Sequence, residues 1–550
     1  QYSDGRVDTF VFDSVGNLVT QKNPDSEENY EYDRVQRVTR VTNLTLGKSF
    51  EYGYDLAGRI TRIGNPRGGS ANLYSYDPAG RLIQSIAADS DGRPNSFAYD
   101  RAGRMNRREL ANGAVANYTY DATGRLSRLA EQVGATQLVD MQFQYDPAGN
   151  ITNLTRDGGR YESMTYDNND RLASYARNGK RVDYTYDAVG NRVRELGSIV
   201  TGNGDVSNTY NQLNQLMRRD SLTEGATQFE YDARGNRIVQ NDAGQRTQFT
   251  YSLENQLTKI KQASGDEYAY RYDAVGRRVY KSFKKYQPQL ANGGVGINDP
   301  PLEATHMLYD RRQVLYDMTD DKAAKALYHY TPQSDMPYGN LISMKSYDSV
   351  NTSIDTLFYH TDHLGTTQKM TDKNGSVRVS YDHDAWGNVI AHSGDERSVT
   401  PAGAPAALNL EPTNRYTYTS KEHEFGTKLT AMDARVYDPR TASFKQRDPL
   451  SMASAMVNSP VTMYAGMAGG GVADMQANPL RTARYGYVAG NPLRYIDPTG
   501  MEISTVLTDM GYYGQNKYGA TTYNGSGYNY NGSASSQSDG CYSWDSFLSK

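Results

Sequence analysis

Along the first half of the chain, apolar and polar residues alternate over short stretches, and each stretch ends at an aspartate. The segment Ala116-Asn-Tyr-Thr-Tyr120 is one example. A period of two is typical of a β-strand with one buried face. The aspartate can accept hydrogen bonds from amides two residues on and start a turn. A glycine three residues after it supplies the positive φ that a Cβ would obstruct.

This strand and turn recur as one unit, aromatic–Asp–x–x–Gly–Arg/Asn–aliphatic. Thirteen aspartate-equivalent positions run from 13 to 273 at intervals of 20 to 25 residues, so each unit predicts about two strands and two turns. One hairpin alone is marginal in water, and we expect the units to stack into one long all-β sheet that coils into a hollow shell. The close copies begin at Phe12, Tyr54, Tyr76, Tyr99, Tyr120, Tyr145, Tyr186, Tyr231 and Tyr272, and the weaker copies at Tyr32, Tyr166, Tyr210 and Tyr251.

The composition fits a tyrosine-rich sheet without a thick apolar core. The chain has 46 Tyr against 12 Phe, and its 51 Gly supply turns. The repeated Tyr and Asp side chains could form a ladder for a ligand, but their use in every unit favours turn formation and sheet packing. The net charge is −4 without a basic block, so we expect no nucleic-acid binding by the shell. No apolar run is long enough for a transmembrane segment.

The repeat pattern ends near residue 283. Residues 284–305 contain three prolines and little periodicity, which predicts a loop, and strands resume over 306–413. The chain starts in mid-pattern, which suggests a fragment or a processed product. Its one cysteine, Cys541, allows no disulfide within the chain.

Residues 306–413 contain a cluster of candidate metal ligands. The cluster comprises His360, Asp362, His363, His383 and Asp384. Its spacing fits no structural zinc pattern, and no cysteines accompany it. Turn formation and packing are the favoured roles, so we expect no metal and no cofactor.

Four motifs in order carry a resemblance to a known family. They are Asp362–Gly365 (DHLG), Tyr381–Asn388 (a YDxxGN turn), Arg435–Pro449 and Asn491–Met501. Together with the repeats, they resemble the YD-repeat family and specifically its Rhs core. The resemblance covers residues 1–501.

The resemblance implies a shell that encloses a C-terminal effector segment and cuts the chain once, with an aspartyl-protease-type site. The bond would be Met501–Glu502. The catalytic pair would be Asp448 and Asp497, because such chemistry needs two carboxylates close enough to share a proton. Arg447 would orient one of them. The activity would be at most a single turnover, and residues 1–501 show no other enzyme.

The chain departs from the family pattern at three places. Ala442-Ser-Phe444 replaces Gly-Arg-Phe, and the first Asp-Pro motif reads DPLS. An insert over 451–479 that is rich in Met, Gly and Ala interrupts the core region of 414–501. Asp-Pro also starts turns generally. Residues 502–550 are rich in Gly, Tyr, Asn and Ser, which is typical of a variable tail or the start of an effector.

Three functions remain open. The first is a polymorphic-toxin container, secreted or at the cell surface and delivered by a bacterial secretion or toxin system. Its partners would be its own C-terminal segment and a secretion-system spike or toxin-complex subunits. The alternative is a structural or adhesive YD-repeat surface protein, similar to teneurins or wall-associated proteins, without a cut. A carbohydrate-binding sheet that uses exposed Tyr and Trp386 is a third interpretation.

Overall fold

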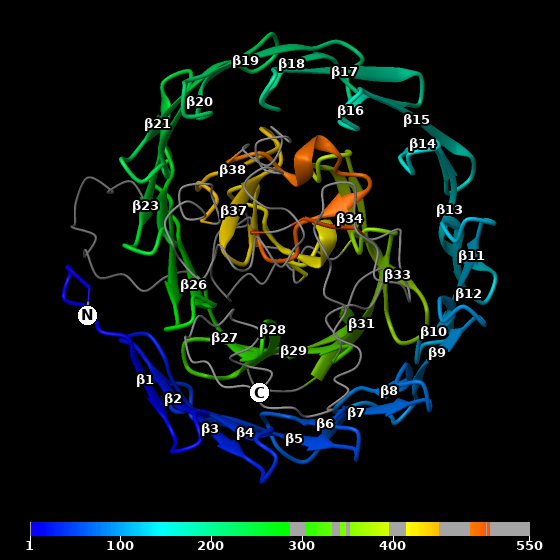
Figure 1. Cartoon of the computed structure of the whole chain (residues 1–550), viewed down its shortest axis with the longest axis vertical. Coiled ribbons are helices and arrows are strands. Elements are labelled where there is room, and N and C mark those ends of the chain that lie inside the picture. Colours follow the sequence, from blue (N-terminus) through cyan, green and yellow to red (C-terminus); the bar gives the residue numbers. More distant parts are fainter. Residues whose placement is uncertain are drawn as a thin grey trace, which may run out of the picture.

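The computed structural model describes residues 2–286, 303–332, 341–347, 353–394, 414–449, 484–501 and 503–505. Thirty-four strands form one antiparallel sheet in which each strand pairs with the strands before and after it in sequence. The sheet coils into a spiral (Figure 1). The prediction of an all-β shell built from YD hairpins is therefore confirmed.

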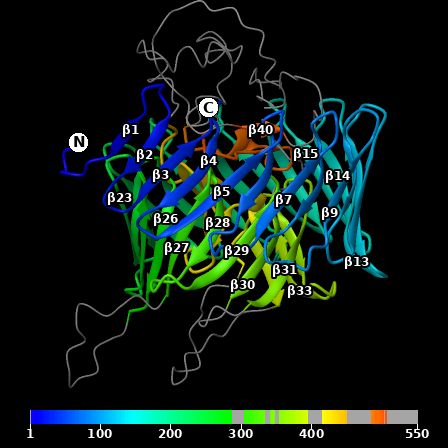
Figure 2. The same cartoon turned by 90° about the horizontal axis from the view of Figure 1, so that it is seen from below.

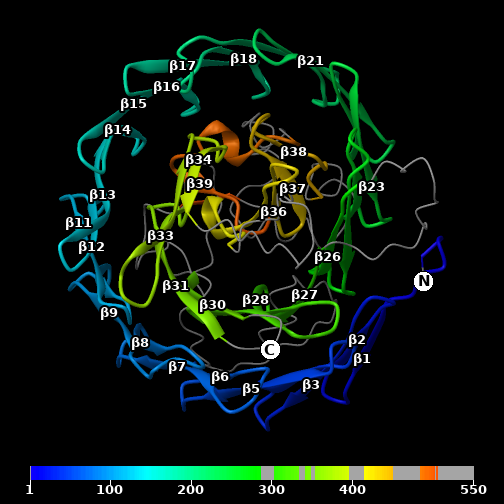
Figure 3. The ribbon, with the colours of Figure 1, turned by 180° about the vertical axis from the view of Figure 1, so that it is seen from behind.

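The first 26 strands form the outer turn of the spiral, the ring seen from both sides in Figures 1 and 3. They are β1 (Thr9–Phe12), β2 (Leu18–Lys22), β3 (Glu27–Tyr32), β4 (Val38–Asn43), β5 (Lys48–Tyr54), β6 (Ile60–Gly64), β7 (Ala71–Tyr76), β8 (Leu82–Ile86), β9 (Asn95–Tyr99), β10 (Met105–Glu109), β11 (Ala114–Tyr120), β12 (Leu126–Val133), β13 (Thr136–Tyr145), β14 (Ile151–Arg156), β15 (Arg160–Tyr166), β16 (Leu172–Arg177), β17 (Lys180–Tyr186), β18 (Arg192–Gly197), β19 (Asp205–Tyr210), β20 (Leu216–Ser221), β21 (Gly225–Tyr231), β22 (Arg237–Asp242), β23 (Gln245–Tyr251), β24 (Leu257–Lys261), β25 (Glu267–Tyr272) and β26 (Arg278–Lys284).

The next eight strands form the inner turn, which lies inside the ring (Figure 1). Most of the predicted loop between the two turns, residues 287–302, lies outside the described residues. The strands are β27 (Glu303–Asp310), β28 (Gln313–Met318), β29 (Ala324–Tyr330), β30 (Leu341–Tyr347), β31 (Ser353–Thr361), β32 (Thr367–Thr371), β33 (Val377–His383) and β34 (Val389–Gly394).

The remaining described residues, 414–449, 484–501 and 503–505, form what we call the closing segment. It lies inside the ring near one rim (Figures 1 and 2). Among the described residues, no helix is long and apolar enough to cross a membrane. Its elements are η1 (Tyr418–Ser420), β35 (Glu422–Glu424), β36 (Leu429–Met432), β37 (Arg435–Asp438), β38 (Ser443–Phe444), η3 (Val488–Gly490), β39 (Tyr495–Ile496) and β40 (Ser504–Thr505).

One unit shows why the YD sequence builds this wall. The Asp121 carboxylate accepts the backbone N–H groups of Thr123 and Arg125, both at 2.9 Å, and Arg125 Nε at 2.8 Å. The hydroxyl of Tyr120 donates to the carbonyl of Met105 in the preceding unit at 2.6 Å. The Arg125 guanidinium lies over the ring of Tyr145 in the next unit. Tyr, Asp and Arg therefore join each unit to its neighbours.

The four weaker copies form the same turn without glycine. The residue at the glycine position has φ between 59° and 66° in each of them. Asn and Asp tolerate this conformation better than most side chains. These residues are Gln36, Asp170, Asn214 and Asn255.

Asp121→Ala should weaken the wall only locally. The variant loses hydrogen bonds to turn amides, which should cost about 1–2 kcal/mol of unfolding free energy. Because the units contact mainly their neighbours, hydrogen exchange should rise in β11 and β12 and stay unchanged in β21–β24. Asp91→Ala is the control, because the Asp91 side chain is 63% exposed. Equal acceleration in all strands would contradict the local effect.

The two turns of the spiral pack face to face over one hydrophobic cluster. It joins outer-turn residues from Leu18 to Tyr184 with inner-turn residues from Leu308 to Trp386. Polar contacts cross the same layer: Tyr74 donates to the carbonyl of Tyr330 at 3.0 Å. The sequence separation between contacting residues is 258 at Tyr52–Asp310 and 259 at Asn112–Thr371, and it falls to 205 at Arg177–Asp382. Beyond Thr371 the inner turn thus uses fewer residues than the outer turn for the same arc, as a smaller radius requires.

Side chains join the two ends of the outer turn. Asn23 Nδ2 donates to the carbonyl of Tyr272 at 2.8 Å, and Arg277 pairs with Glu28 at 2.6 Å. Burial would raise the pKa of Glu28, but Arg277 and neighbouring hydrogen bonds hold it below its usual range. The described strand ladders pair only sequence neighbours, so the ring closes here through side chains.

Candidate functional site

The two predicted aspartates meet at one guanidinium. Asp448 follows β38 and Asp497 follows β39. Asp448 Oδ2 lies 3.2 Å from Arg435 Nη1, and Asp497 Oδ2 lies 3.2 Å from Arg435 Nη2. Positions 49 residues apart in sequence are therefore brought together, with Arg435 of β37 bridging them.

Arg435 is held from several sides. Its guanidinium carbon lies 3.6 Å from the centre of the Phe444 ring, and its Nε donates to the carbonyl of Gly500. Its side chain is 4% exposed. A planar guanidinium suits this position, because it can meet two carboxylates and a carbonyl from different nitrogens. Arg435 therefore links both acids to the backbone that leads into the predicted bond.

The segment from Asp497 to Met501 is fixed by a turn. Asp497 Oδ1 accepts the N–H of Met501 at 3.0 Å, and Thr499 Oγ1 lies 3.3 Å from the same nitrogen. Gly500 has φ +72°, and a Cβ there would lie 2.1 Å from the carbonyl oxygen of Met432. Only glycine fits, so the DPTG sequence sets the path of the chain up to Met501.

The two carboxylates differ in exposure. The Asp497 side chain is 3% exposed and that of Asp448 is 25% exposed. The Asp448 amide donates to the carbonyl of Arg484 at 2.9 Å. Asp448 is thus the acid that solvent water can reach, while Asp497 holds the chain.

Arg447, the predicted orienting residue, lies against the wall at the Gly235 turn, where an added Cβ would be 3.3 Å from Arg447 Cβ. Sequence reasoning missed Arg435, although the motif Arg435–Pro449 contains it. Glu502 lies outside the described residues, as do the insert at 451–479 and nearly all of the tail at 502–550.

Buried charges dock the closing segment on the wall. At the aliphatic position of its YD unit the chain has Arg237, which is 1% exposed and pairs with Asp438 at 3.1 Å. Lys445 lies 3.4 Å from the same carboxylate. Burial lowers the pKa of Lys445 to about 7. Burial alone would raise the pKa of Asp438, but Lys445 and Arg237 hold it below its usual range.

The second half of the closing segment makes hydrogen bonds to the YD turns of the outer wall. Asn491 Nδ2 donates to the carbonyl of Asp170 at 2.8 Å, and the Tyr485 hydroxyl donates to the carbonyl of Gly235 at 2.8 Å. Arg494 donates to the carbonyl of Ala148 at 2.7 Å. The YD turns therefore position the strands that hold Asp497 and Asp448.

The His- and Asp-rich motifs of the inner turn are further YD-type turns. Asp362 accepts the amides of Leu364 and Thr366, both at 2.9 Å. Asp384 accepts the amide of Trp386 at 2.8 Å, so Asp384 begins the second turn and His383 takes the place of the tyrosine. Within the described residues, no group of three His, Cys, Asp or Glu side chains could hold a metal.

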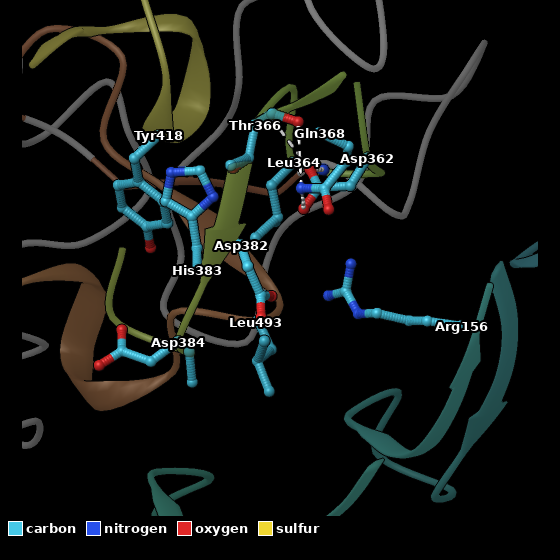
Figure 4. Close-up of a pocket in the computed structure, with 11 residues that line it drawn as sticks. Arg156, Asp362, Leu364, Thr366, Gln368, Asp382, His383, Asp384, Tyr418 and Leu493 are labelled. Carbon is cyan, nitrogen blue, oxygen red and sulfur yellow. Dashed lines mark hydrogen bonds between the residues drawn. The ribbon is translucent and has the colours of Figure 1, made fainter. Parts of the chain in front are cut away.

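A small cavity lies between these turns and the outer wall (Figure 4). Arg156 reaches toward it from β14, opposite Asp362 and His383. Both ring nitrogens of His383 are buried without a hydrogen-bond partner, and burial lowers the pKa of His383 to about 3. Tyr418 borders the cavity and also packs against Tyr487 of the closing segment. Asp448, Asp497 and Arg435 do not line this cavity, so it is separate from the carboxylate pair.

A spiral of YD hairpins around an internal closing segment defines a class of β-shell proteins. Residues 3–129 and 115–414 match the model of the Teneurin YD-shell family, and the chain belongs to this family.

Toxins are among the relatives of this chain. The tRNA3(Ser)-specific nuclease WapA of Bacillus spizizenii is 27% identical over 277 residues, 49% of this chain and 10% of the relative. Toxin protein Tse5 of Pseudomonas aeruginosa is 25% identical over 422 residues, 70% of this chain and 28% of the relative. The crystal structure of TcdB2-TccC3-TEV superposes with a TM-score of 0.67 at 16% identity, over 90% of this chain and 25% of that chain. The chain thus spans a minor part of each.

Proposed function

We propose that this chain is the container of a toxin, which encloses its own C-terminal segment and releases it by one cut between Met501 and Glu502. The observation that carries the proposal is the meeting of Asp448 and Asp497 on Arg435, whose Nε holds the Gly500 carbonyl beside that bond. An arginine also lies between two acids at Arg277, which pairs with Glu28 and Asp273, but Arg435 in addition holds the carbonyl of Gly500, one residue before the proposed bond.

The residues suggest distinct roles in a hydrolysis. The partly exposed Asp448 carboxylate draws a proton from water, whose oxygen attacks the Met501 carbonyl carbon. Asp497 and Arg435 hold the chain in position through the Met501 amide and the Gly500 carbonyl. The C–N bond then breaks, the nitrogen of Glu502 takes the proton, and one water is consumed. The site acts once per chain, because the substrate is the chain itself.

The partners follow from the same proposal. The first is the chain's own segment after Met501, inside the shell. Toxin-complex subunits or a secretion-system spike are further partners, supported by the similarity to the TcdB2-TccC3 structure. Delivery to the outside of the cell or to its surface by a bacterial secretion or toxin system belongs to the same proposal.

Asp448→Asn should leave the chain uncut. The amide keeps the shape of the side chain but removes its basicity, so the rate should fall by roughly 100-fold or more. A denaturing gel with mass spectrometry should show a fragment ending at Met501 in the wild type and the full-length chain in the variant. Asp433→Asn is the matched control, because Asp433 lies in the same segment and its half-exposed side chain pairs with Lys421 at the surface.

Two outcomes would count against the proposal. A wild-type chain that stays intact after folding would favour the structural or adhesive surface protein. A cut that persists in Asp448→Asn would remove Asp448 from the chemistry.

A further inference from the structure

The chain beyond the proposed cut returns to the site as a strand. β40 pairs antiparallel with β39, with Tyr495 opposite Thr505 and Ile496 opposite Ser504. This short hairpin encloses Asp497 and the turn that ends at Met501. The backbone is therefore held on both sides of the bond, at Met501 by Asp497 and at Ser504 by Ile496.

A side chain just beyond the bond has its own place in the closing segment. Ile503 is partly buried and packs against an apolar cluster. The rings within this cluster are closely packed, with Tyr437 and Tyr487 centred 4.3 Å apart. The cluster consists of Tyr418, Met432, Tyr437, Phe444, Tyr487, Val488 and Tyr495.

The same cluster supports the charged part of the site. Phe444 lies under the Arg435 guanidinium and 5.9 Å from the Tyr487 ring. Burial raises the pKa of Tyr487, and the Asp497 charge raises it further. One group of aromatic side chains thus carries both the guanidinium that bridges the acids and the aliphatic residue two positions after the bond.

We propose that Ile503 is the specificity-determining residue on the downstream side of the cut, and that this aromatic cluster is its binding site. The inference rests on the proposed function and deepens it. An aliphatic side chain in the cluster fixes the register of the Met501–Glu502 bond against Asp448 and Arg435. The β39–β40 pairing adds main-chain hydrogen bonds, as in recognition of an extended peptide by a sheet edge.

The same interactions remain after the bond is cut. Hydrolysis changes only the ends at Met501 and Glu502, so Ile503 and the β40 ladder still hold the new N-terminus. The cleaved segment should therefore stay bound to the closing segment until the shell opens or unfolds.

Substitution of Ile503 should change the rate of the cut in order of side-chain size. Ile503→Val should slow it about twofold to threefold, and Ile503→Ala roughly tenfold or more, because a side chain that positions the reacting bond contributes directly to the rate. Ile503→Asp should slow it further, since a carboxylate in an aromatic cluster is unfavourable. The control is Ile354→Ala, because Ile354 is 50% exposed on the inner turn. The measurement is the time course of the fragment on a denaturing gel.

Hydrogen exchange separates this inference from the proposed function. Amides of residues 495–505 should be protected in the full chain and lose protection in Ile503→Ala, while β11–β13 stay unchanged and show that the shell has folded. If the wild type is never cut, this exchange result still supports or overturns the binding of Ile503 by the aromatic cluster. A wild-type rate and the same cut position in both Ile503→Ala and Ile503→Asp would overturn it, as would unprotected amides in the wild type.

Discussion

Arg435→Leu should abolish the cut and loosen the closing segment from the shell. The variant leaves the 3%-exposed Asp497 carboxylate without the cation that bridges it to Asp448. Removal of one partner from a buried ion pair typically costs about 3–5 kcal/mol. The Gly500 carbonyl also loses its donor, so the bond loses its position. Thermal unfolding and the denaturing gel are the two measurements.

Two further variants separate charge from shape at this position. Arg435→Lys keeps the positive charge, but an ammonium cannot bond both carboxylates and the Gly500 carbonyl as the planar guanidinium does. We therefore expect a stability between those of the wild type and Arg435→Leu, and little cutting. Arg435→Leu combined with Asp497→Asn should recover part of the lost stability, because the buried carboxylate that Arg435 neutralised is gone, and it should remain uncut. Arg93→Leu is the control, since Arg93 is 69% exposed. An Arg435→Leu chain that is as stable as the wild type and still cut would contradict this account.

Mild acid should destabilise the inner turn and the closing segment before the outer turn. All seven histidines of the chain lie between residues 306 and 423. Burial lowers the pKa of His329 and of His383 to about 3, and that of His423 to about 4. Their ordinary value is 6.5.

The sign of this effect follows from proton uptake. Below pH 6.5 the unfolded chain binds protons at these histidines and the folded chain does not, so stability falls with pH until the folded pKa is reached. At pH 4.5 each of these three histidines should lower the free energy of unfolding by about 2–3 kcal/mol. Burial raises the pKa of Asp384 to about 6, so the folded state takes up a proton there and offsets about 2 kcal/mol. The net loss is on the order of 5 kcal/mol.

Carboxylates held ionised by buried cations contribute little in this pH window. Burial raises the pKa of Glu131, but Arg108 and His360 outweigh it and lower the value to about 2. Its contribution to stability is lost only below its ordinary value of 4.5. The loss between pH 6.5 and 4.5 therefore belongs mainly to the histidines.

Hydrogen exchange at pH 7.5, 5.5 and 4.5 would test this prediction, after correction for the intrinsic exchange rate. Protection should fall in β29–β33 while β11–β15 remain protected. His329→Phe and His383→Phe should each flatten the pH dependence, and the exposed His392→Gln should leave it unchanged. Equal acid sensitivity of both turns would contradict the prediction.

The spacing of the YD units was sufficient to predict the wall, because each turn is built from local contacts. Asp121 caps its own turn and Tyr120 reaches only the preceding unit. Even the copies without glycine, at Gln36 and Asn214, keep the positive φ. The repeated YD sequence therefore determines a repeated hairpin through contacts within each unit and with its neighbours.

The arrangement inside the shell was less accessible from sequence. Asp448 and Asp497 could be named as a pair, with Arg447 predicted to orient one of them, but the bridge that Arg435 forms between both acids was not predicted. Which arginine reaches both acids depends on the strand of the closing segment that faces them. The contact between Arg237 and Asp438, which are 201 residues apart in sequence, fixes that strand against the wall. Nothing in the sequence singled out Ile503, because one aliphatic residue after the proposed cut forms no pattern. Its place becomes visible only in the structure, where β40 pairs with β39.

The pairing of every strand with its sequence neighbours also determines the order of assembly. A strand of the wall can join the sheet as soon as it has been synthesised, because its partner is already present. The closing segment has to wait, since its contacts reach wall turns such as Ala148 and Gly235 from positions roughly 250 to 350 residues later. The acids and Arg435 therefore come into register only after most of the ring has formed. If the proposed cut takes place at that site, it should therefore occur only after most of the shell has assembled.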